Sequence, residues 1–317
     1  METGLLTLGD HTPDPDTGKT TTQQQRFRNI IQQGILAESL GFDAIHIGEH
    51  HFCDYIVSVP QMLLAAIAEK TDTIRLSTGV TLLANHDPVR LAEDYASLDV
   101  ISNGRAELVA GRGDRFVEAY QQMGINIEDS ADIYAENLDL LRKLWTETNL
   151  SWQGRFRPPL ENANAQPRPV QQPHIPIWIG GASKSSIQLT ASHGLPLQLP
   201  GVFAGAPAFK GLAEMYRSAY SETKHDPANC KVGFTAHIHV RKNSQDAKKH
   251  WEKHHLSYLN WVWDIILAGG QMGMEKPAYT AENTFGPDLI APALCGSPAE
   301  VLDKLSGWQK VLGGIDR

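Results

Sequence analysis

The sequence predicts an α/β fold in which strands and helices alternate along the chain. Short runs rich in Val, Ile and Leu recur, and each is followed by a stretch whose apolar residues repeat at helical spacing. Gly- or Pro-containing breaks separate these segments. Alternating strand–helix units give a parallel sheet with right-handed crossovers. By the residues alone, the seven expected strands fit either an eight-stranded barrel without its last element or an open doubly wound sheet.

The elements follow in chain order. Residues 26–39 carry a helical apolar stripe, and Pro60 fits the first position of a helix over residues 61–70. Ser297, Pro298 and Glu300 form a helix start with an N-cap, a Pro at N1 and a Glu at N3. The expected strands are residues 5–8, 43–47, 74–83, 106–110, 175–179, 195–199 and 232–240. The expected helices are residues 26–39, 61–70, 88–101, 132–146, a helix opening at 180–183, 206–222, 244–258 and 297–311.

Two stretches interrupt this order, and we interpret both as excursions from a single barrel domain over residues 1–317. Residues 149–173 are rich in Pro, Asn and Gln, with a short hairpin expected around 151–156. Residues 260–294 are a candidate lid, with hinges at Gly269, Gly270 and Gly273.

The chain ends shortly after the Gly313-Gly314 break, at the point where Ile315 is expected to begin an eighth strand. An eight-stranded barrel needs that strand, because otherwise the edges of the first and seventh strands would stay unpaired. We therefore expect the natural chain to continue past residue 317.

Composition narrows the function classes. The chain has 317 residues, of which 41% are hydrophobic, and a formal net charge of −8. The acidic balance and the lack of a Lys/Arg-rich run argue against nucleic acid or an anionic membrane as partner. With neither a long apolar run nor a leader-like start, a soluble, cytoplasmic protein is expected. Cys53, Cys230 and Cys295 have no metal-like spacing and are expected to be free thiols.

The segment Gly48-Glu49-His50-His51-Phe52 follows a buried strand, at the strand end where α/β barrels place their sites. Adjacent residues on an extended chain point to opposite faces. One of His50 and His51 is therefore expected to face the site while the other packs beneath it. Ordinary satisfied histidines are about as common in such positions.

Two further segments suit an anion such as phosphate. Gly180-Gly181-Ala182-Ser183 opens a helix, where free N–H groups and the hydroxyls of Ser183 and Ser186 can meet an anion. The ordinary alternative is a serine N-cap after a glycine turn. Arg112 leaves the fourth strand between two glycines, and its guanidinium suits phosphate. An ion pair with Asp114, or with Glu93 and Asp94, would also explain it.

Two other features are weaker. Gly79-Val80 lies inside the third strand, where a glycine indicates a bulge, a close backbone approach or tight packing. His237 and His239, two residues apart on the seventh strand, suggest a metal. No donors at other strand ends complete such a site, so we expect none.

Together these segments resemble the bacterial luciferase-like family of flavin-dependent monooxygenases. The resemblance covers nearly the whole chain in order, through Gly41-Phe42-Asp43, Gly48-Glu49-His50-His51-Phe52, Asp87-Pro88-Val89-Arg90-Leu91-Ala92-Glu93-Asp94, Ser102-Asn103-Gly104-Arg105, Gly111-Arg112-Gly113, Pro167-Arg168-Pro169-Val170-Gln171, Pro176-Ile177-Trp178-Ile179-Gly180-Gly181-Ala182-Ser183 and Gly296-Ser297-Pro298. It implies a (β/α)8 barrel, often dimeric, that binds reduced flavin at the carboxyl face of its strands.

The resemblance also implies residue roles. His50 matches the catalytic histidine, and Gly79–Val80 matches a non-prolyl cis peptide under the flavin ring. Arg112, Ser183 and Ser186 match residues that hold the flavin phosphate, with Gly181 and Ala182 beside them. Luciferase has a cysteine where this chain has Gly111, so a different substrate is expected.

The expected function is FMN-dependent monooxygenation of a small organic substrate, using reduced FMN that a separate flavin reductase can supply, in a homodimer. Three alternatives stay open. One is a deazaflavin-dependent reductase on the same fold. Another is a metal-dependent barrel hydrolase built on His50, His51, His237 and His239. The third is a non-catalytic flavin-binding barrel.

Overall fold

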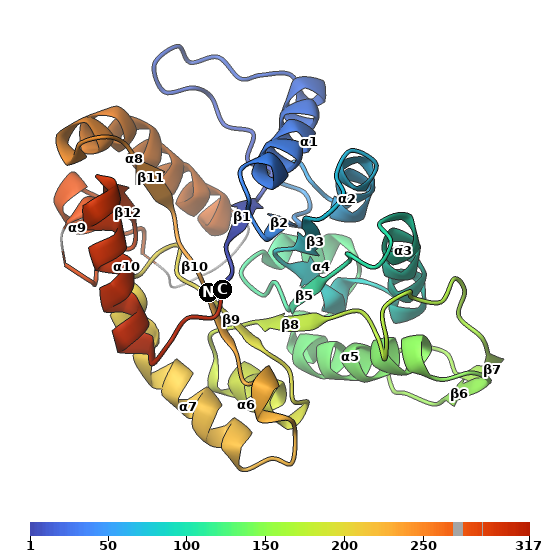
Figure 1. The fold of residues 1–317 in the computed structure, drawn as a ribbon. Helices are drawn as coiled ribbons and strands as arrows, with labels where there is room; N and C mark the ends of the chain where they lie inside the picture. The colour runs from blue at the N-terminus through green and yellow to red at the C-terminus, as the bar shows by residue number, and fades with distance from the viewer. Residues whose placement is uncertain (269–274, 287) are drawn as a thin grey trace. The chain divides into compact units, whose positions relative to one another are not determined.

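The computed structural model describes residues 1–268, 275–286 and 288–317, which form alternating strands and helices (Figure 1). Contacts divide the chain into two compact units. The N-terminal unit comprises Glu2–His11 and Thr21–Trp178, and the C-terminal unit comprises Met1, Thr12–Thr20 and Ile179–Arg317. The boundary falls inside strand β8 (Ile177–Gly180). The single domain expected over residues 1–317 stays a prediction.

The N-terminal unit is built on short parallel strands. β1 (Gly4–Thr7), β2 (Ala44–Ile47) and β3 (Arg75–Thr78) pair in that order. β4 (Thr81–Leu82) pairs with β5 (Leu108–Gly111). Every residue of β2 and β5 is buried, as in parallel sheets that are covered on both faces. The strand expected over residues 74–83 is thus two strands, separated by a Gly79–Val80 peptide bond that is cis.

Helices α1 (Gln23–Ser39), α2 (Pro60–Ala68) and α3 (Pro88–Ile101) lie along the outer side of β1–β3 (Figure 1). The sequence predicted all three, and their starts have local causes: side-chain caps at α1 and α3 and a proline at the first position of α2. The Asp87 carboxylate accepts the backbone N–H of Val89 at 2.8 Å and satisfies a free donor of the first turn of α3. α5 (Ser130–Thr146) was also expected, whereas the short α4 (Val117–Gln122), η1 (Leu83–Asn85) and η2 (Ile127–Asp129) were not.

Two of the family-like segments have structural roles in this unit. The Arg105 guanidinium donates to the carbonyls of Ala68 at 3.0 Å and Thr71 at 2.8 Å, so it caps the end of α2. The buried Asp99 carboxylate accepts the backbone N–H groups of Val170 at 2.8 Å and Gln171 at 3.0 Å. These bonds fix the first excursion, whose hairpin consists of β6 (Leu150–Trp152) and β7 (Leu160–Ala163).

The C-terminal unit continues the parallel pattern. The end of β8 pairs with β9 (Leu197–Pro200), and β9 pairs with β10 (Val232–Thr235). The helical elements between and after these strands are α6 (Lys184–Ser192), η3 (Ala206–Phe209), α7 (Lys210–Ser221), η4 (Pro227–Asn229) and α10 (Pro298–Leu312). Trp308 and Tyr216 are fully buried in the core of this unit.

Two expectations for this unit are wrong. The predicted strand over residues 232–240 is two strands, because β11 (Ile238–Val240) leaves β10 and pairs with β12 (Leu294–Gly296). The helix predicted to end at 258 is α8 (Ser244–Ala268). Its continuation buries one face, formed by Leu259, Val262, Trp263 and Ile266.

The described part of residues 260–294 therefore includes regular structure, namely the end of α8, the helix α9 (Ala281–Phe285) and the first residue of β12. The proposed hinges Gly269, Gly270 and Gly273 lie outside the described residues. The role of this stretch as a lid stays a prediction.

The last residues run along β10. Asp316 N–H donates to the Val232 carbonyl at 2.8 Å, and Phe234 N–H donates to the Arg317 carbonyl at 2.9 Å. Ile315 is buried. Strand-like pairing therefore begins where the sequence placed the start of an eighth strand.

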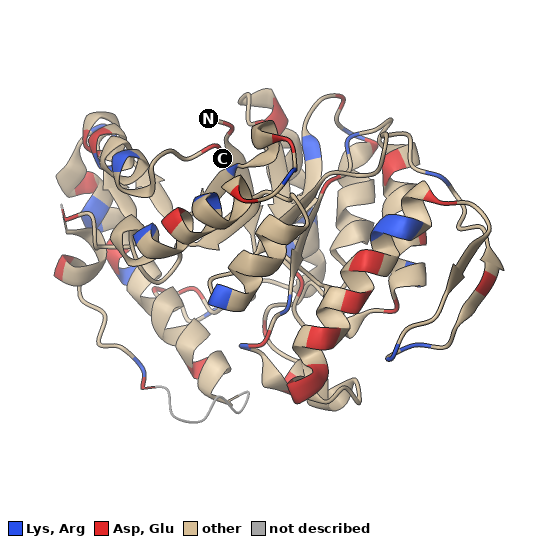
Figure 2. Ribbon diagram, turned by 90° about the horizontal axis from the view of Figure 1, so that it is seen from below, with Lys and Arg blue, Asp and Glu red and all other residues tan. Residues whose placement is uncertain are grey.

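Lys and Arg are interspersed with Asp and Glu over the helices (Figure 2). None of the described helices has the length and apolar character needed to cross a membrane. Cys53, Cys230 and Cys295 are free and partly buried, as expected.

Candidate functional site

The segment from Gly48 to Phe52 begins at the carboxyl end of β2. Gly48 N–H donates to the Thr7 carbonyl at 2.9 Å, which ties the end of β2 to β1. A Cβ on Gly48 would lie 2.7 Å from the Leu8 side chain and 3.2 Å from the Gly79 carbonyl oxygen. A larger residue at position 48 would need Leu8 and the Gly79 backbone to shift. Phe52 ends the segment with a φ of 57°, a left-handed conformation that turns the chain sharply.

His50 sits between two aromatic rings. It stacks on Tyr55 with ring centroids 4.3 Å apart, and it meets Phe116 in a T-shaped arrangement with ring centroids 4.7 Å apart. Its Nδ1 atom is buried and has no hydrogen-bond partner among the described residues. Burial lowers the pKa of His50 to about 4, against a smaller opposing effect of the Glu49 carboxylate. His50 is therefore neutral near pH 7, and a neutral imidazole can accept or donate a proton.

The Glu49 carboxylate accepts three hydrogen bonds, and Glu49 was not among the site residues predicted from the sequence. Its side chain is fully buried. Oε1 accepts from His51 Nε2 at 2.8 Å and from His86 Nε2 at 2.7 Å, and Oε2 accepts the Leu82 backbone N–H at 3.2 Å. We call Glu49, His51 and His86 the Glu49 cluster.

The hydrogen bonds of the Glu49 cluster shift the pKa values of Glu49 and His86 in opposite directions. Despite burial, which acts the other way, the hydrogen bonds from His51 and His86 lower the pKa of Glu49. Burial opposes protonation of His86 too, but the Glu49 carboxylate outweighs it and raises the pKa of His86. Which of His50 and His51 faces the site stays a prediction. His86 could have been found in the sequence, because it follows the neighbouring strand.

The cis peptide at Gly79–Val80 agrees with the bond that the family resemblance implied. Val80 packs against Gly111 of β5, where an added Cβ would lie 2.4 Å from Val80 Cγ2. Such an approach forbids any larger residue without a shift of Val80. The cysteine of luciferase at this position would therefore need a different neighbour.

Arg112 forms an ion pair with Asp114, the alternative that the sequence left open. Its side chain is 34% exposed, and its carbonyl accepts a hydrogen bond from the Tyr120 hydroxyl. The guanidinium thus combines one bound carboxylate with an exposed part that can meet another anion.

Ser183 is the N-cap of α6 and forms a capping box with Ser186. Ser183 Oγ accepts the Ser186 N–H at 3.2 Å, and Ser183 N–H donates to Ser186 Oγ at 3.0 Å. A Cβ on Gly181 would lie 2.6 Å from Ser186 Oγ. Gly181, Ala182 and Ser183 belong to the C-terminal unit and Arg112 to the N-terminal one, so their joint phosphate site stays a prediction.

His237 and His239 are surrounded by rings. The ring centroids of His237 and His255 are 4.6 Å apart. The rings of His239 and His250 are parallel, with centroids 5.2 Å apart. Within the described part of the chain, one set of three His, Cys, Asp or Glu residues has donor atoms close enough to share a metal ion. It is the Glu49 cluster, which includes none of His50, His237 and His239. The donor set considered for a hydrolase joins residues of both units, so it stays a prediction.

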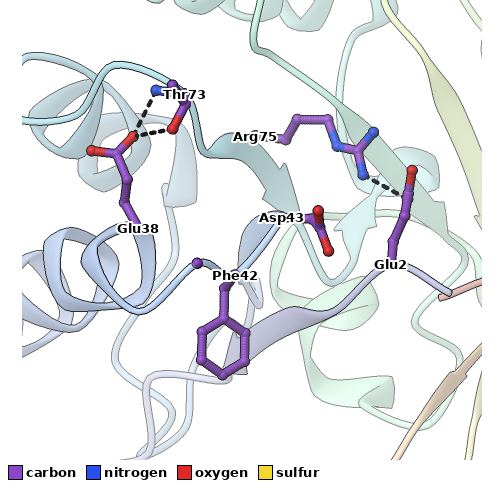
Figure 3. Close-up of a pocket in the computed structure, with 7 residues that line it drawn as sticks. Glu2, Glu38, Phe42, Asp43, Thr73 and Arg75 are labelled. Atoms are coloured by element: carbon purple, nitrogen blue, oxygen red, sulfur yellow. Dashed lines mark hydrogen bonds and ion pairs between the residues drawn. The ribbon is translucent and has the colours of Figure 1, made fainter.

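A hollow of about 390 Å³ lies at the amino ends of β1–β3 (Figure 3). Its charged groups are already engaged, since Arg75 pairs with Glu2 at 2.6 Å and Glu38 accepts the Thr73 N–H at 2.6 Å. The hollow is lined by Glu2, Glu38, Gly41, Phe42, Asp43, Thr73 and Arg75. Because His50 follows the opposite, carboxyl end of β2, this hollow is separate from the candidate site.

The family model described as Luciferase-like monooxygenase matches residues 1–313. The chain belongs to this family. The uncharacterized protein y4vJ of Sinorhizobium fredii is 33% identical over 209 residues, which cover 65% of this chain and 58% of that protein. The oxygenase component of the flavin-dependent trigonelline monooxygenase of Acinetobacter baylyi is 28% identical over 297 residues, covering 91% of this chain and 81% of the relative.

Solved structures share the fold. Monooxygenase RslO1 from Streptomyces bottropensis has a TM-score of 0.80 at 24% identity and covers 99% of this chain and 90% of its own. The oxygenating constituent of 3,6-diketocamphane monooxygenase from Pseudomonas putida, in complex with FMN, has a TM-score of 0.77 at 21% identity with the same coverage. The coenzyme F420 dependent tetrahydromethanopterin reductase of Methanopyrus kandleri has a TM-score of 0.71 at 17% identity, covering 98% and 90%.

These likenesses confirm the (β/α)8 barrel class of the luciferase-like type that the sequence predicted. The family model and the Acinetobacter baylyi relative confirm, at the level of the family, the expectation of flavin-dependent monooxygenase chemistry. The roles of individual site residues stay predictions.

Proposed function

We propose that this protein is an FMN-dependent monooxygenase that inserts oxygen from O2 into a small organic substrate. The observation that carries the proposal is His50, a neutral histidine with a buried, unpartnered Nδ1 among the described residues, at the strand end where barrels of this class place their chemistry. An orphaned buried nitrogen suits a bound group that supplies its missing hydrogen bond.

Reduced FMN, when bound, supplies the activation of O2, and the protein's own residues have other tasks. His50 is a hydrogen-bond donor or acceptor near the reacting atoms and a general acid/base for the substrate. The Gly79–Val80 backbone supports the flavin ring, and Tyr55 and Phe116 shield His50 from water. Arg112, Ser183 and Ser186 hold the phosphate, with Gly181 and Ala182 allowing its close approach.

Reduced FMN comes from a separate flavin reductase, as the name of the Acinetobacter baylyi relative, an oxygenase component, suggests. We further propose a cytoplasmic homodimer, which light scattering can test. The same fold in an F420-dependent reductase supports deazaflavin as the alternative cofactor. A spectrum of the protein mixed with FMN and a flavin reductase separates the cases. Bound flavin that is re-oxidised by O2 fits the monooxygenase, whereas an oxygen-stable reduced flavin contradicts it.

The phosphate site is tested by Arg112→Ala. We expect FMN binding to weaken by about 1.5–3 kcal/mol, the range for a lost hydrogen bond to a charged group. Arg115→Ala is the matched control, because Arg115 is an exposed arginine of the same loop. Equal FMN affinity of the Arg112 variant and the wild type, measured by fluorescence titration, would remove Arg112 from the site.

The catalytic role is tested by His50→Ala and His51→Ala. His50→Ala should retain FMN binding and lose most turnover, because we expect the imidazole to act on the reacting atoms and not to hold the cofactor. His51→Ala should mainly lower stability, because it leaves the buried Glu49 carboxylate without one donor. If the two variants behave the other way round, the two histidines have exchanged roles.

A further inference from the structure

The donor atoms of the Glu49 cluster converge on one point. The ligand atoms of Glu49, His51 and His86 all lie within 4.8 Å of one another. Glu49 Oε1 is 2.8 Å from His51 Nε2 and 2.7 Å from His86 Nε2. Two imidazole nitrogens and one carboxylate oxygen form a donor set that Zn2+ and similar divalent ions bind.

The cluster is held in place from outside. The second carboxylate oxygen of Glu49 accepts the Leu82 N–H, so the free rotation of the side chain is lost. The buried Asn137 amide donates to the carbonyls of both Leu83 and His86 at 3.0 Å, which fixes the backbone that carries His86. Outer partners of this kind orient metal ligands in proteins.

The distances between the donor atoms and the exposure of the cluster also fit a bound metal ion. Donors about 2.0–2.2 Å from one metal ion lie roughly 3 Å from each other. The atoms of the cluster need to separate by only a few tenths of an ångström. The side chains of Glu49 and His51 are 0% and 11% exposed, whereas that of His86 is 28% exposed. His86 thus provides a route for an ion and room for a water ligand.

We propose that Glu49, His51 and His86 form a binding site for one Zn2+ ion or a chemically similar first-row divalent ion, completed by water on the side of His86. The ion replaces the imidazole N–H protons that now bond to the carboxylate. It links the end of β2 to the residue after η1, which are 37 residues apart, and it makes the N-terminal unit more stable. This proposal does not depend on the proposed function.

The test uses the full chain without a histidine tag, treated with a chelator and then titrated with Co2+. We expect one Co2+ per chain, visible d–d absorption bands of a site with nitrogen and oxygen ligands, and a higher melting temperature. Zn2+ should displace the Co2+ and abolish the bands.

Two variants locate the site. His86→Gln should weaken Co2+ binding at least 100-fold, and this variant should fold because His86 is half-buried. Glu49→Gln keeps the shape of the side chain while removing its charge, and it should weaken binding as strongly.

The control variant changes His239 and His250 to Gln. These neighbouring imidazoles are the other obvious place for an adventitious ion. The control should bind Co2+ within twofold of the wild type.

Three results would overturn the proposal. They are no saturable binding by the wild type, unchanged affinity of His86→Gln, or loss of binding in the His239/His250 control. In each case the Glu49 cluster is a hydrogen-bonded network alone.

Discussion

Two histidine-rich regions of the molecule differ in the neighbours that surround their imidazoles, and the pKa values of the histidines shift in opposite directions. In the Glu49 cluster of the N-terminal unit, a buried carboxylate accepts hydrogen bonds from two imidazoles and raises the pKa of His86. In the C-terminal unit, His255 is 3% exposed and stacks on Trp251 at 4.1 Å, with His237 and Phe285 close by. Burial, with a smaller effect of His237, lowers the pKa of His255 to about 2.

The difference teaches that the neighbours of a buried histidine, and not burial alone, decide its charge. A carboxylate at hydrogen-bond distance stabilises the imidazolium, whereas aromatic rings offer no full counter-charge. His255 Nε2 has no hydrogen-bond partner among residues 1–268, 275–286 and 288–317. Three predictions test this contrast.

The largest expected effect is that of Glu49→Ala. This change removes the Glu49 carboxylate, so the imidazoles of His51 and His86 and the Leu82 N–H lose their acceptor. The free energy of unfolding should fall by roughly 3–5 kcal/mol, as for breaking a buried charged network. Urea unfolding followed by circular dichroism measures it. A loss below about 1 kcal/mol, the size of one ordinary hydrogen bond, would contradict a large contribution of the Glu49 carboxylate to stability.

The second prediction concerns pH. Because the pKa of folded His255 lies below its unfolded value, its contribution to stability is complete above about pH 6.5 and is lost as pH falls toward 2. Between pH 7 and 5 this amounts to about 2 kcal/mol for one fully shielded histidine. His50, with a pKa of about 4, acts in the same direction.

His86 has the opposite sign, because its raised pKa favours the folded state below about pH 6.5 and loses that effect as pH rises. Unfolding curves at pH 7 and pH 5 should therefore converge in His255→Phe and diverge further in His86→Gln. Identical pH dependence of both variants would erase the contrast between the two regions.

The smallest effect is expected for His255→Phe at pH 7. Phenylalanine keeps a ring among Trp251 and Phe285 and removes a buried nitrogen that lacks a partner. The variant should be more stable by about 1 kcal/mol, the lower end of the cost of an unsatisfied polar group. A clear destabilisation in the same urea experiment would show that the His255 ring makes a hydrogen bond that matters.

Much of the fold could be predicted from the sequence because its causes are local. The helix starts at Pro88 and Pro298 depend on a cap and a proline within one turn. The buried strand β2 depends on four adjacent residues. The end of α8 was missed although its signal is also local. Leu259, Val262, Trp263 and Ile266 repeat at helical spacing.

Some residues of the candidate site could likewise be named from the sequence, and others could not. His50, Arg112 and Ser183 could be named from the sequence, because each follows a strand and carries a side chain suited to its task. Glu49, next to His50, was not named among the site residues, and His86 was overlooked. Their pairing joins residues 37 positions apart, and no periodic pattern reports a contact of that kind.

The sequence by itself determined the order of strands and helices, the caps and the family, because hydrophobic spacing and capping act within a few residues. Tertiary structure alone decided three further features: which imidazoles meet the Glu49 carboxylate, which stack on Trp251, and how closely Val80 approaches Gly111. The physical reason is that charge state and close packing depend on neighbours that folding brings together from distant parts of the chain.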